Sequence, residues 1–131
     1  MANPAAKQGD MIVATDIHII LLPTPAGPVP TPLPHLFGGQ LDGALSRDVN
    51  IDGKPAATKG STATNSPSHI PQGGPFQSPP KNRGEVFMGS ATVNINGKPA
   101  ARLGDTALTC NDPADQPVGQ VIAVSTVLIG G

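Results

Sequence analysis

The stretch VNINGKPAA, residues 93–101, decides the fold of this chain because the chain contains it twice. The other copy is VNIDGKPAA, residues 49–57, which lies 44 residues earlier. When residues 49–63 are aligned with residues 93–107, eleven of the fifteen positions are identical. A repeat this close indicates that two parts of the chain fold alike.

Each copy predicts a short β-hairpin. Valine and isoleucine alternate at every second position, which is typical of a half-buried strand. The dipeptides Asp52-Gly53 and Asn96-Gly97 that follow are favoured in tight type I′ turns, where both central residues have positive φ angles. The proline after the turn cannot donate a hydrogen bond to a sheet, so it belongs at an edge or a bend.

A third copy is divided between the two ends of the chain. PAAKQGD at residues 4–10 matches only the return half of the repeat, whereas TVLIGG at residues 126–131 resembles TVNING at residues 92–97. If these halves form one repeat, the termini lie side by side and the chain closes into an object with approximate threefold symmetry. The alternative is that the C-terminal segment is an ordinary apolar edge strand.

The composition predicts a single all-β domain, residues 1–131, with a weak apolar core. The chain has 16 glycines and 16 prolines, three phenylalanines, and neither tryptophan nor tyrosine. Small domains of this kind usually need a disulfide, a metal ion or a partner for stability. Because there is one cysteine, an internal disulfide is excluded. The net charge of −1 and the scarcity of aromatic residues argue against nucleic-acid binding.

The N-terminal region and the apolar segments predict where the protein is made. The N-terminus has no basic region followed by an apolar run, so we expect no signal peptide and synthesis in the cytoplasm. Segments 17–22 and 121–129 are apolar but too short to span a bilayer.

Two proline-rich stretches interrupt the repeats. Residues 23–34 contain six prolines and are expected to form an extended, polyproline-like arm, and residues 73–84 are expected to form a second loop. Either stretch is a surface connection or a contact site for a partner, and the sequence leaves both alternatives open.

The repeats also predict a metal site. His18 and His69 each lie nine residues after a repeat glycine, and Cys110 lies six residues after the third repeat glycine. If three equivalent loops converge on one axis at the apex, these side chains meet there, and His35 is the natural fourth ligand. Three imidazoles and one thiolate form a closed tetrahedral set that suits one structural zinc ion.

An enzyme is the alternative to a structural site. Asp10, Asp16, Asp105 and Asp112 lie near the same loops, and a three-ligand zinc with a carboxylate base would suit a hydrolase. However, Asp10 and Asp105 follow the repeat glycine where the second copy has Ser61, and Asp or Ser at such a position more simply caps backbone amides. No nucleophile–base pair or phosphate-binding loop is present, so we expect no enzymatic activity.

The segment GSATVNINGKPAARLGD, residues 89–105, resembles the PAAR-repeat family, and the similarity runs from Pro4 to the C-terminus. Lys7 and Thr58 replace the motif's arginine in the other two copies. The resemblance implies a conical, β-rich tip, with zinc at its leading point, on the spike of contractile injection machines: type VI secretion systems, extracellular injection particles and phage tails.

The resemblance also implies the partners. The expected partner is a trimeric, β-helical (VgrG-like) spike protein that binds one tip monomer per trimer, with toxin effectors as further candidates and only transient contact with a target membrane. The tip would then leave the cytoplasm at the end of the injection particle. A free-standing zinc-dependent effector adaptor is the alternative. The equivalent apolar positions of the three repeats are candidates for spike binding or inter-strand packing: Val49, Ile51, Val93, Ile95, Val127 and Ile129.

Overall fold

The computed structural model describes residues 2–131, and every regular element in this range is a β-strand. The strands are β1 (Asn3–Pro4), β2 (Met11–Leu22), β3 (Val29–Gly43), β4 (Asn50–Ile51), β5 (Lys54–Pro55), β6 (Thr62–Asn65), β7 (Arg83–Val86), β8 (Asn94–Ile95), β9 (Lys98–Pro99), β10 (Thr106–Thr109), β11 (Gln116–Ile122) and β12 (Leu128–Ile129). The all-β prediction is therefore confirmed. Within the described residues, no helix is long and apolar enough to cross a membrane.

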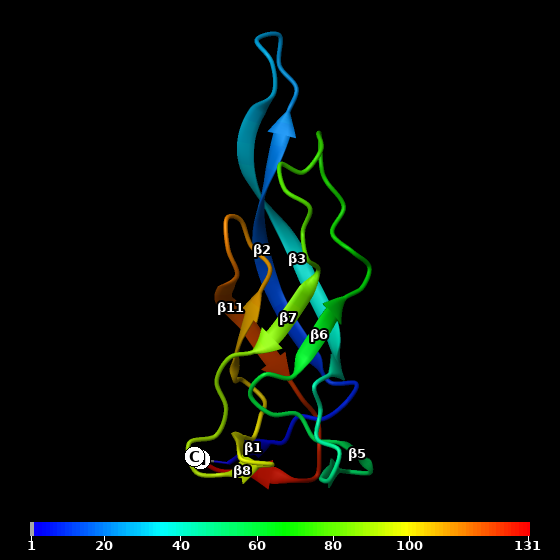
Figure 1. Cartoon of the computed structure of the whole chain (residues 1–131), viewed down its shortest axis with the longest axis vertical. Coiled ribbons are helices and arrows are strands. Elements are labelled where there is room, and N and C mark those ends of the chain that lie inside the picture. The colour runs from blue at the N-terminus through cyan, green and yellow to red at the C-terminus, as the bar shows by residue number, and fades with distance from the viewer. Residues whose placement is uncertain (1) are drawn as a thin grey trace.

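The molecule has a broad base, a barrel above it and a narrow hairpin at the top (Figure 1). Three two-stranded sheets, β1–β12, β4–β5 and β8–β9, form the base. The barrel is closed and antiparallel, with strand order β10-β11-β2-β3-β6-β7. Each Pro-Ala-Ala copy leads from the base into one barrel hairpin, so the barrel consists of three hairpins: β2–β3, β6–β7 and β10–β11.

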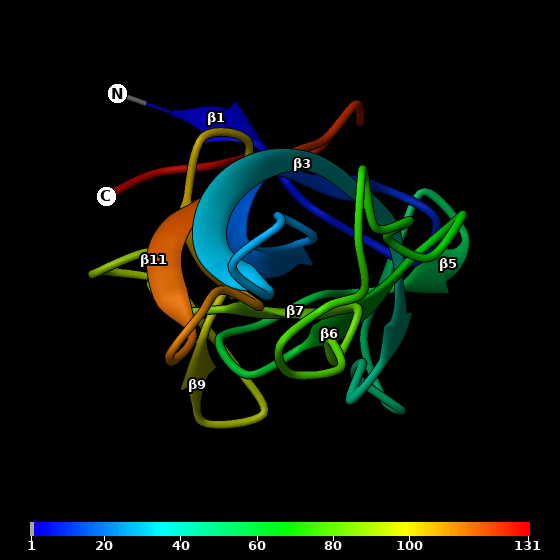
Figure 2. The same ribbon diagram turned by 90° about the horizontal axis from the view of Figure 1, so that it is seen from above.

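The termini complete the third base hairpin. Strand β1 pairs with β12 so that Pro4 lies opposite Leu128, as Pro55 lies opposite Asn50 and Pro99 opposite Asn94. Figure 2 shows the two chain ends next to each other beside β1. This pairing is the one that the split-repeat interpretation predicts.

The hairpin turns have the predicted backbone conformation. The φ angles are +49° at Asp52 and +80° at Gly53, and +55° at Asn96 and +78° at Gly97. Positive φ at both central residues is the requirement of a type I′ turn. Asp or Asn at the first position tolerates this conformation better than most residues, which explains the choice of side chain.

A ring of backbone hydrogen bonds joins the three Pro-Ala-Ala copies. The amide of Ala6 donates to the carbonyl of Ala101 (2.9 Å), Ala101 donates to Ala57 (3.0 Å), and Ala57 donates to Ala6 (3.0 Å). A second set runs in the opposite direction, from Gln8 to Pro55 (2.9 Å), Lys59 to Pro99 (2.8 Å) and Leu103 to Pro4 (2.9 Å). Each copy is thus bonded to both of the others.

The apolar interior is divided into two small clusters. The base cluster contains Ala5, Ala56 and Ala100 together with one isoleucine from each base hairpin: Ile51, Ile95 and Ile129. These isoleucines are 5–8% exposed, and Val49 and Val93 pack against the same cluster. These five residues therefore pack together inside the base. The remaining candidate, Val127, is 37% exposed.

The residues that follow the repeat glycines cap the turns. The carboxylate of Asp10 accepts a hydrogen bond from the amide of Lys7 (3.0 Å), and Asp105 accepts one from the amide of Arg102 (2.7 Å). Ser61 accepts the corresponding bond from Thr58 (2.9 Å). The equivalence of Asp and Ser that the sequence suggests is thus a shared capping role.

The first proline-rich stretch is not a separate arm, because residues 29–34 belong to strand β3. Pro30, Pro32 and Pro34 lie opposite Leu21, Ile19 and Ile17 of β2. These β2 residues make their backbone hydrogen bonds on the side away from β3, so the pairs with proline require no donor from it. Prolines at every second position therefore permit a long strand.

Because this hairpin is long, its turn lies at the apex of the molecule, where the sequence predicts the metal site. Strand β2 continues four residues past His18, and the turn between β2 and β3 forms the top of the molecule (Figure 1). The predicted metal ligand on β2 consequently lies below the tip rather than at it.

The close packing of this ring predicts that a larger side chain at any of its alanine positions destabilises the protein. Ala101 is fully buried, so Ala101→Val should destabilise the fold by about 1–3 kcal/mol through overpacking. Ala91→Val, at an exposed position, is the matched control and should change stability by less than about 0.5 kcal/mol. Guanidinium chloride unfolding measures both, and equal midpoints would contradict the close packing of the ring.

Candidate metal centre

Five polar side chains meet inside the upper part of the barrel. Asp16 and His18 come from β2, His35 from β3, His69 from the loop after β6, and Cys110 from the residue directly after β10. All are buried, with exposed fractions of 0–9%. Alternation along β2 directs residues 16 and 18 to the interior, and Asp16 lies directly opposite His35 in the register.

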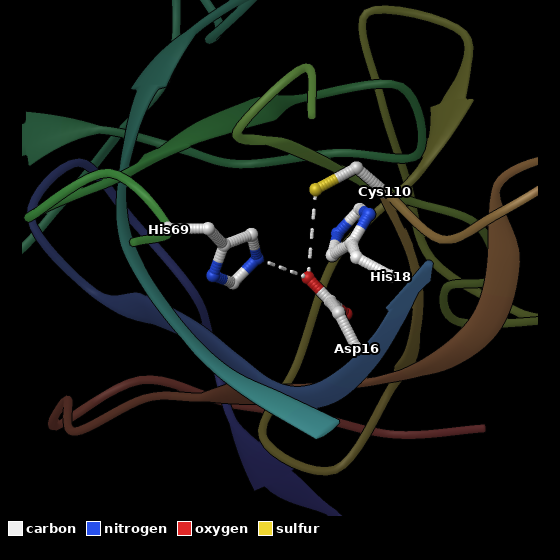
Figure 3. Close-up of side chains that lie close together, drawn as sticks. All are labelled: Asp16, His18, His69 and Cys110. Atoms are coloured by element: carbon white, nitrogen blue, oxygen red, sulfur yellow. Dashed lines mark hydrogen bonds and ion pairs between the residues drawn. The ribbon is translucent and has the colours of Figure 1, made fainter. Parts of the chain in front are cut away.

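The structure brings the predicted residues together. His18, His69 and Cys110 each offer a ligand atom, and these atoms lie within 4.8 Å of one another and of an Asp16 oxygen (Figure 3). The ring centre of His18 is 4.9 Å from that of His69, and His35 is 5.5 Å from both. His35 therefore borders the cluster rather than belonging to its tightest group.

The analysis of the sequence did not include Asp16 among the ligands, although it is the centre of the hydrogen-bond network. One carboxylate oxygen accepts from Thr109 Oγ1 (2.5 Å) and from Asn111 Nδ2 (3.4 Å). The other accepts from His69 Nε2 (2.9 Å) and lies 3.5 Å from Cys110 Sγ. Strand alternation could have indicated Asp16, because it precedes His18 by two residues and so shares its face.

Two histidines have buried ring nitrogens without a hydrogen-bond partner, although His18 Nδ1 lies 3.5 Å from Asp112 Oδ1. Neither nitrogen of His18 has a hydrogen-bond partner, and Nε2 of His35 has none. The Nδ1 atom of His35 lies 3.0 Å from the carbonyl oxygen of Leu33, which only accepts, so Nδ1 carries the hydrogen and Nε2 keeps a free lone pair. Buried polar atoms without partners are rare, and here they are atoms that bind metals well.

The hydrogen position on His69 follows from its neighbours. The amide of Gly38 must meet the oxygen of Asn65 (2.9 Å), so the Asn65 nitrogen faces His69 Nδ1 (3.3 Å) and Asn82 Oδ1 (3.0 Å). His69 Nδ1 is then an acceptor, and Nε2 carries the hydrogen that it donates to Asp16. A metal ion bound at Nε2 would take the place of that hydrogen.

Burial favours the uncharged forms of His18 and Cys110 in the metal-free protein. Desolvation lowers the pKa of His18 below its ordinary value of 6.5, although Asp112 opposes the change. Desolvation, reinforced by the negative charge of Asp16, raises the pKa of the Cys110 thiol from 9.0 to about 11. A cation in the cluster would instead favour the thiolate form of Cys110, because a thiol that coordinates a metal is deprotonated.

The donor set fits a metal ion. Imidazole nitrogens and a thiol sulfur are typical zinc ligands, and the carboxylate of Asp16 adds an oxygen donor and a negative charge. The free nitrogens of His18 and His35 are what a metal would satisfy. The cluster can therefore hold a metal ion.

The comparison with protein families agrees with this geometry. The PAAR motif family matches residues 22–107 and 76–131, which together cover most of the chain. The chain belongs to the PAAR motif family. No curated protein matches the chain.

Membership of this family supports a spike-tip role in contractile injection systems and association with a spike protein. The PAAR family is structural rather than enzymatic. Of the four carboxylates of the hydrolase alternative, Asp10 and Asp105 accept hydrogen bonds from backbone amides, whereas Asp16 and Asp112 lie beside His69 and His18.

The pKa shifts predict how stability of the metal-free protein depends on pH. The pKa of His18 is lower in the folded state, so its contribution is present above about pH 6.5 and is lost as the pH falls through the folded value. The pKa of Cys110 is higher in the folded state, so its contribution is present below about pH 9 and is lost as the pH rises towards 11. For Cys110 the loss amounts to about 2–3 kcal/mol.

Chemical unfolding in excess chelator tests the prediction. It is measured from about pH 5 to about pH 11, a range chosen to include the titration of both groups. Stability should be highest between about pH 6.5 and 9. Cys110→Ser should remove the cysteine part of the alkaline loss, whereas an unchanged alkaline limb would show that the thiol is not the group responsible.

Proposed function

We propose that this chain is a zinc-stabilised tip that caps the trimeric, β-helical (VgrG-like) spike of a contractile injection apparatus and sharpens it for penetration of a target envelope. The tip is made in the cytoplasm and travels at the leading end of the particle. The family match and the construction of the base support this proposal.

The base carries the argument. A trimeric spike ends in three identical surfaces, and a single chain can match them only by presenting the same structure three times. The three base hairpins have the same pairing register and are joined by the ring of alanine hydrogen bonds. A chain with one partner surface would need no such triplication.

We infer that the outer side of the base hairpins is the face offered to the spike. The side chains of Ile51, Ile95 and Ile129 are buried in the base cluster. Because side chains alternate along a strand, the preceding residues Asn50, Asn94 and Leu128 point away from this cluster, and all three are exposed. We assign these positions, with the edges of the short strands, to contact with the spike.

Zinc is proposed to join the upper ends of the three barrel hairpins. His18, His69 and Cys110, which lie together with Asp16, would hold the ion, and His35, with its ring centre 5.5 Å from that of His18, is the proposed fourth ligand. These residues come from strands or loops of all three hairpins. The apolar interior is small and rich in alanine, so a cross-link here would contribute strongly to stability.

Elemental analysis of purified protein tests the metal assignment. We expect about one zinc ion per chain. His18→Ala, His69→Ala and Cys110→Ser should each lower the zinc content and the melting temperature. Asp42→Ala, at an exposed barrel position, is the control and should retain both. Wild-type protein that is free of metal yet equally stable would contradict the assignment.

The stoichiometry with a spike tests the capping role. Native mass spectrometry of the tip mixed with a cognate trimeric spike protein should give one tip per trimer. Replacing the exposed Leu128 by Asp should weaken this complex, while Val124→Asp, also exposed but outside the base strands, should not. A complex with three tips per trimer, or none, would favour the adaptor alternative.

A further inference from the structure

The edge of β2 above the barrel is covered by the loop that carries His69. The amide of Leu21 donates to the carbonyl of Pro75 (2.9 Å), and the amide of Gln77 donates to the carbonyl of Ile19 (2.9 Å). Between them, Phe76 forms a β-bridge with Ile20. Residues 73–77, which we call the strap, therefore pair with the edge of β2 that faces away from β3.

The strap depends on glycine for its close approach. A Cβ atom at Gly74 would lie 2.1 Å from the carbonyl oxygen of Leu21, a distance that real atoms do not adopt. Gly73 has a φ angle of +83°, which other residues rarely adopt. The strap can thus lie on β2 only with glycine at these positions.

Phe76 places an aromatic ring over the candidate metal centre. Its ring centre is 5.9 Å from that of His18, in an edge-to-face arrangement, and 5.5 Å from that of His35. These are the two histidines that have a ring nitrogen without a hydrogen-bond partner. Ile20, opposite Phe76 in the bridge, is completely buried. Phe76 and Ile20 therefore form an apolar layer between the histidines and the hairpin above.

The loop that carries Cys110 is fastened to the same edge of β2. The amide of Asp112 donates to the carbonyl of Ile17 (2.8 Å), and the amide of Ile19 donates to the carboxylate of Asp112 (2.8 Å). The amide of Ile17 donates to Asn111 Oδ1 (2.7 Å). The edge from Ile17 to Leu21 thus holds both loops that bring the remaining ligands to His18.

We propose that the strap locks the His69 loop onto β2 and that Phe76 shields the metal centre, so that the strap determines how slowly the metal is lost rather than how many ions bind. This inference rests on the proposed metal centre. It also assigns a role to the long β2–β3 hairpin, because a β2 strand that ended at His18 would offer the strap no edge.

A cavity at the side gives the competing route for metal loss. It has a volume of about 140 Å³ and is lined by His18, Cys110 and the loops at residues 78–81 and 111–115. Lys81 and Asp115 form an ion pair from these two loops, 3.5 Å between Nζ and Oδ1. If this cavity governed metal loss, breaking the ion pair would matter and removing the strap would not.

Zinc release from the loaded full chain to an excess of a chromophoric chelator tests the proposal. Phe76→Ala removes the shield, and Gly74→Ala displaces the strap. Phe87→Ala, at a 41% exposed phenylalanine, and Gly130→Ala, where an added Cβ meets no atom within 4 Å, are the matched controls. Zinc per chain is measured before release, and the thermal midpoint of each chelator-treated variant shows whether it folds.

A sixth protein, Lys81→Ala, breaks the ion pair beside the cavity. We expect all six proteins to bind one zinc ion, with release roughly tenfold faster in the two strap variants than in the wild type, both controls and Lys81→Ala. Amide hydrogen exchange at Leu21 and Gln77 should also be faster in Gly74→Ala, which reports the strap directly. Release rates within about twofold of the controls, or acceleration by Lys81→Ala alone, would overturn the strap proposal while the zinc centre stands. Wild-type protein that binds no zinc would overturn both.

Discussion

The structure depends on the ring of backbone hydrogen bonds that links the three Pro-Ala-Ala copies. The amide of the second alanine in each copy donates to the carbonyl of the second alanine in another copy, and the three bonds close a ring. Because the bonded groups belong to the main chain, the ring requires only that the side chains be small enough for three strands to meet. Ala5, Ala6, Ala56, Ala57, Ala100 and Ala101 meet that requirement and are at most 1% exposed. The first copy is held in place by β12, so the chain ends complete the base.

The three hairpins above the ring have diverged in length while the base has kept its register. The β2–β3 hairpin has strands of 12 and 15 residues, whereas β6 and β7 have four residues each. The extra length of β2 and β3 changes what the shorter hairpins do: their loops, which carry His69 and Cys110, are bonded to the edge of β2. One long hairpin therefore organises the site to which all three contribute.

The site itself combines opposing electrostatic demands. A buried carboxylate is costly unless donors surround it, and Asp16 has Thr109, Asn111 and His69 as donors. Close beside it, ring nitrogens of His18 and His35 are buried without a hydrogen-bond partner, and the nearest charged group to His18 Nδ1 is an Asp112 oxygen at 3.5 Å. A site that satisfies one group fully and leaves its neighbours open is arranged for a bound cation, which would use the free lone pairs and be balanced by the carboxylate.

The sequence by itself determined the strands and turns of the base and the way the chain closes, because these follow from local backbone chemistry. Asp52-Gly53 and Asn96-Gly97 favour positive φ angles in any context, and the repeat identity forces similar segments into similar folds. It also indicated His18, His69 and Cys110 through their positions after the repeat glycines. Only the tertiary structure showed that Asp16 joins them, that residues 29–34 form a strand, and that Phe76 lies over the histidines. Those features depend on strand register and on contacts between residues up to 95 positions apart, such as Asp16 and Asn111, which local patterns do not encode.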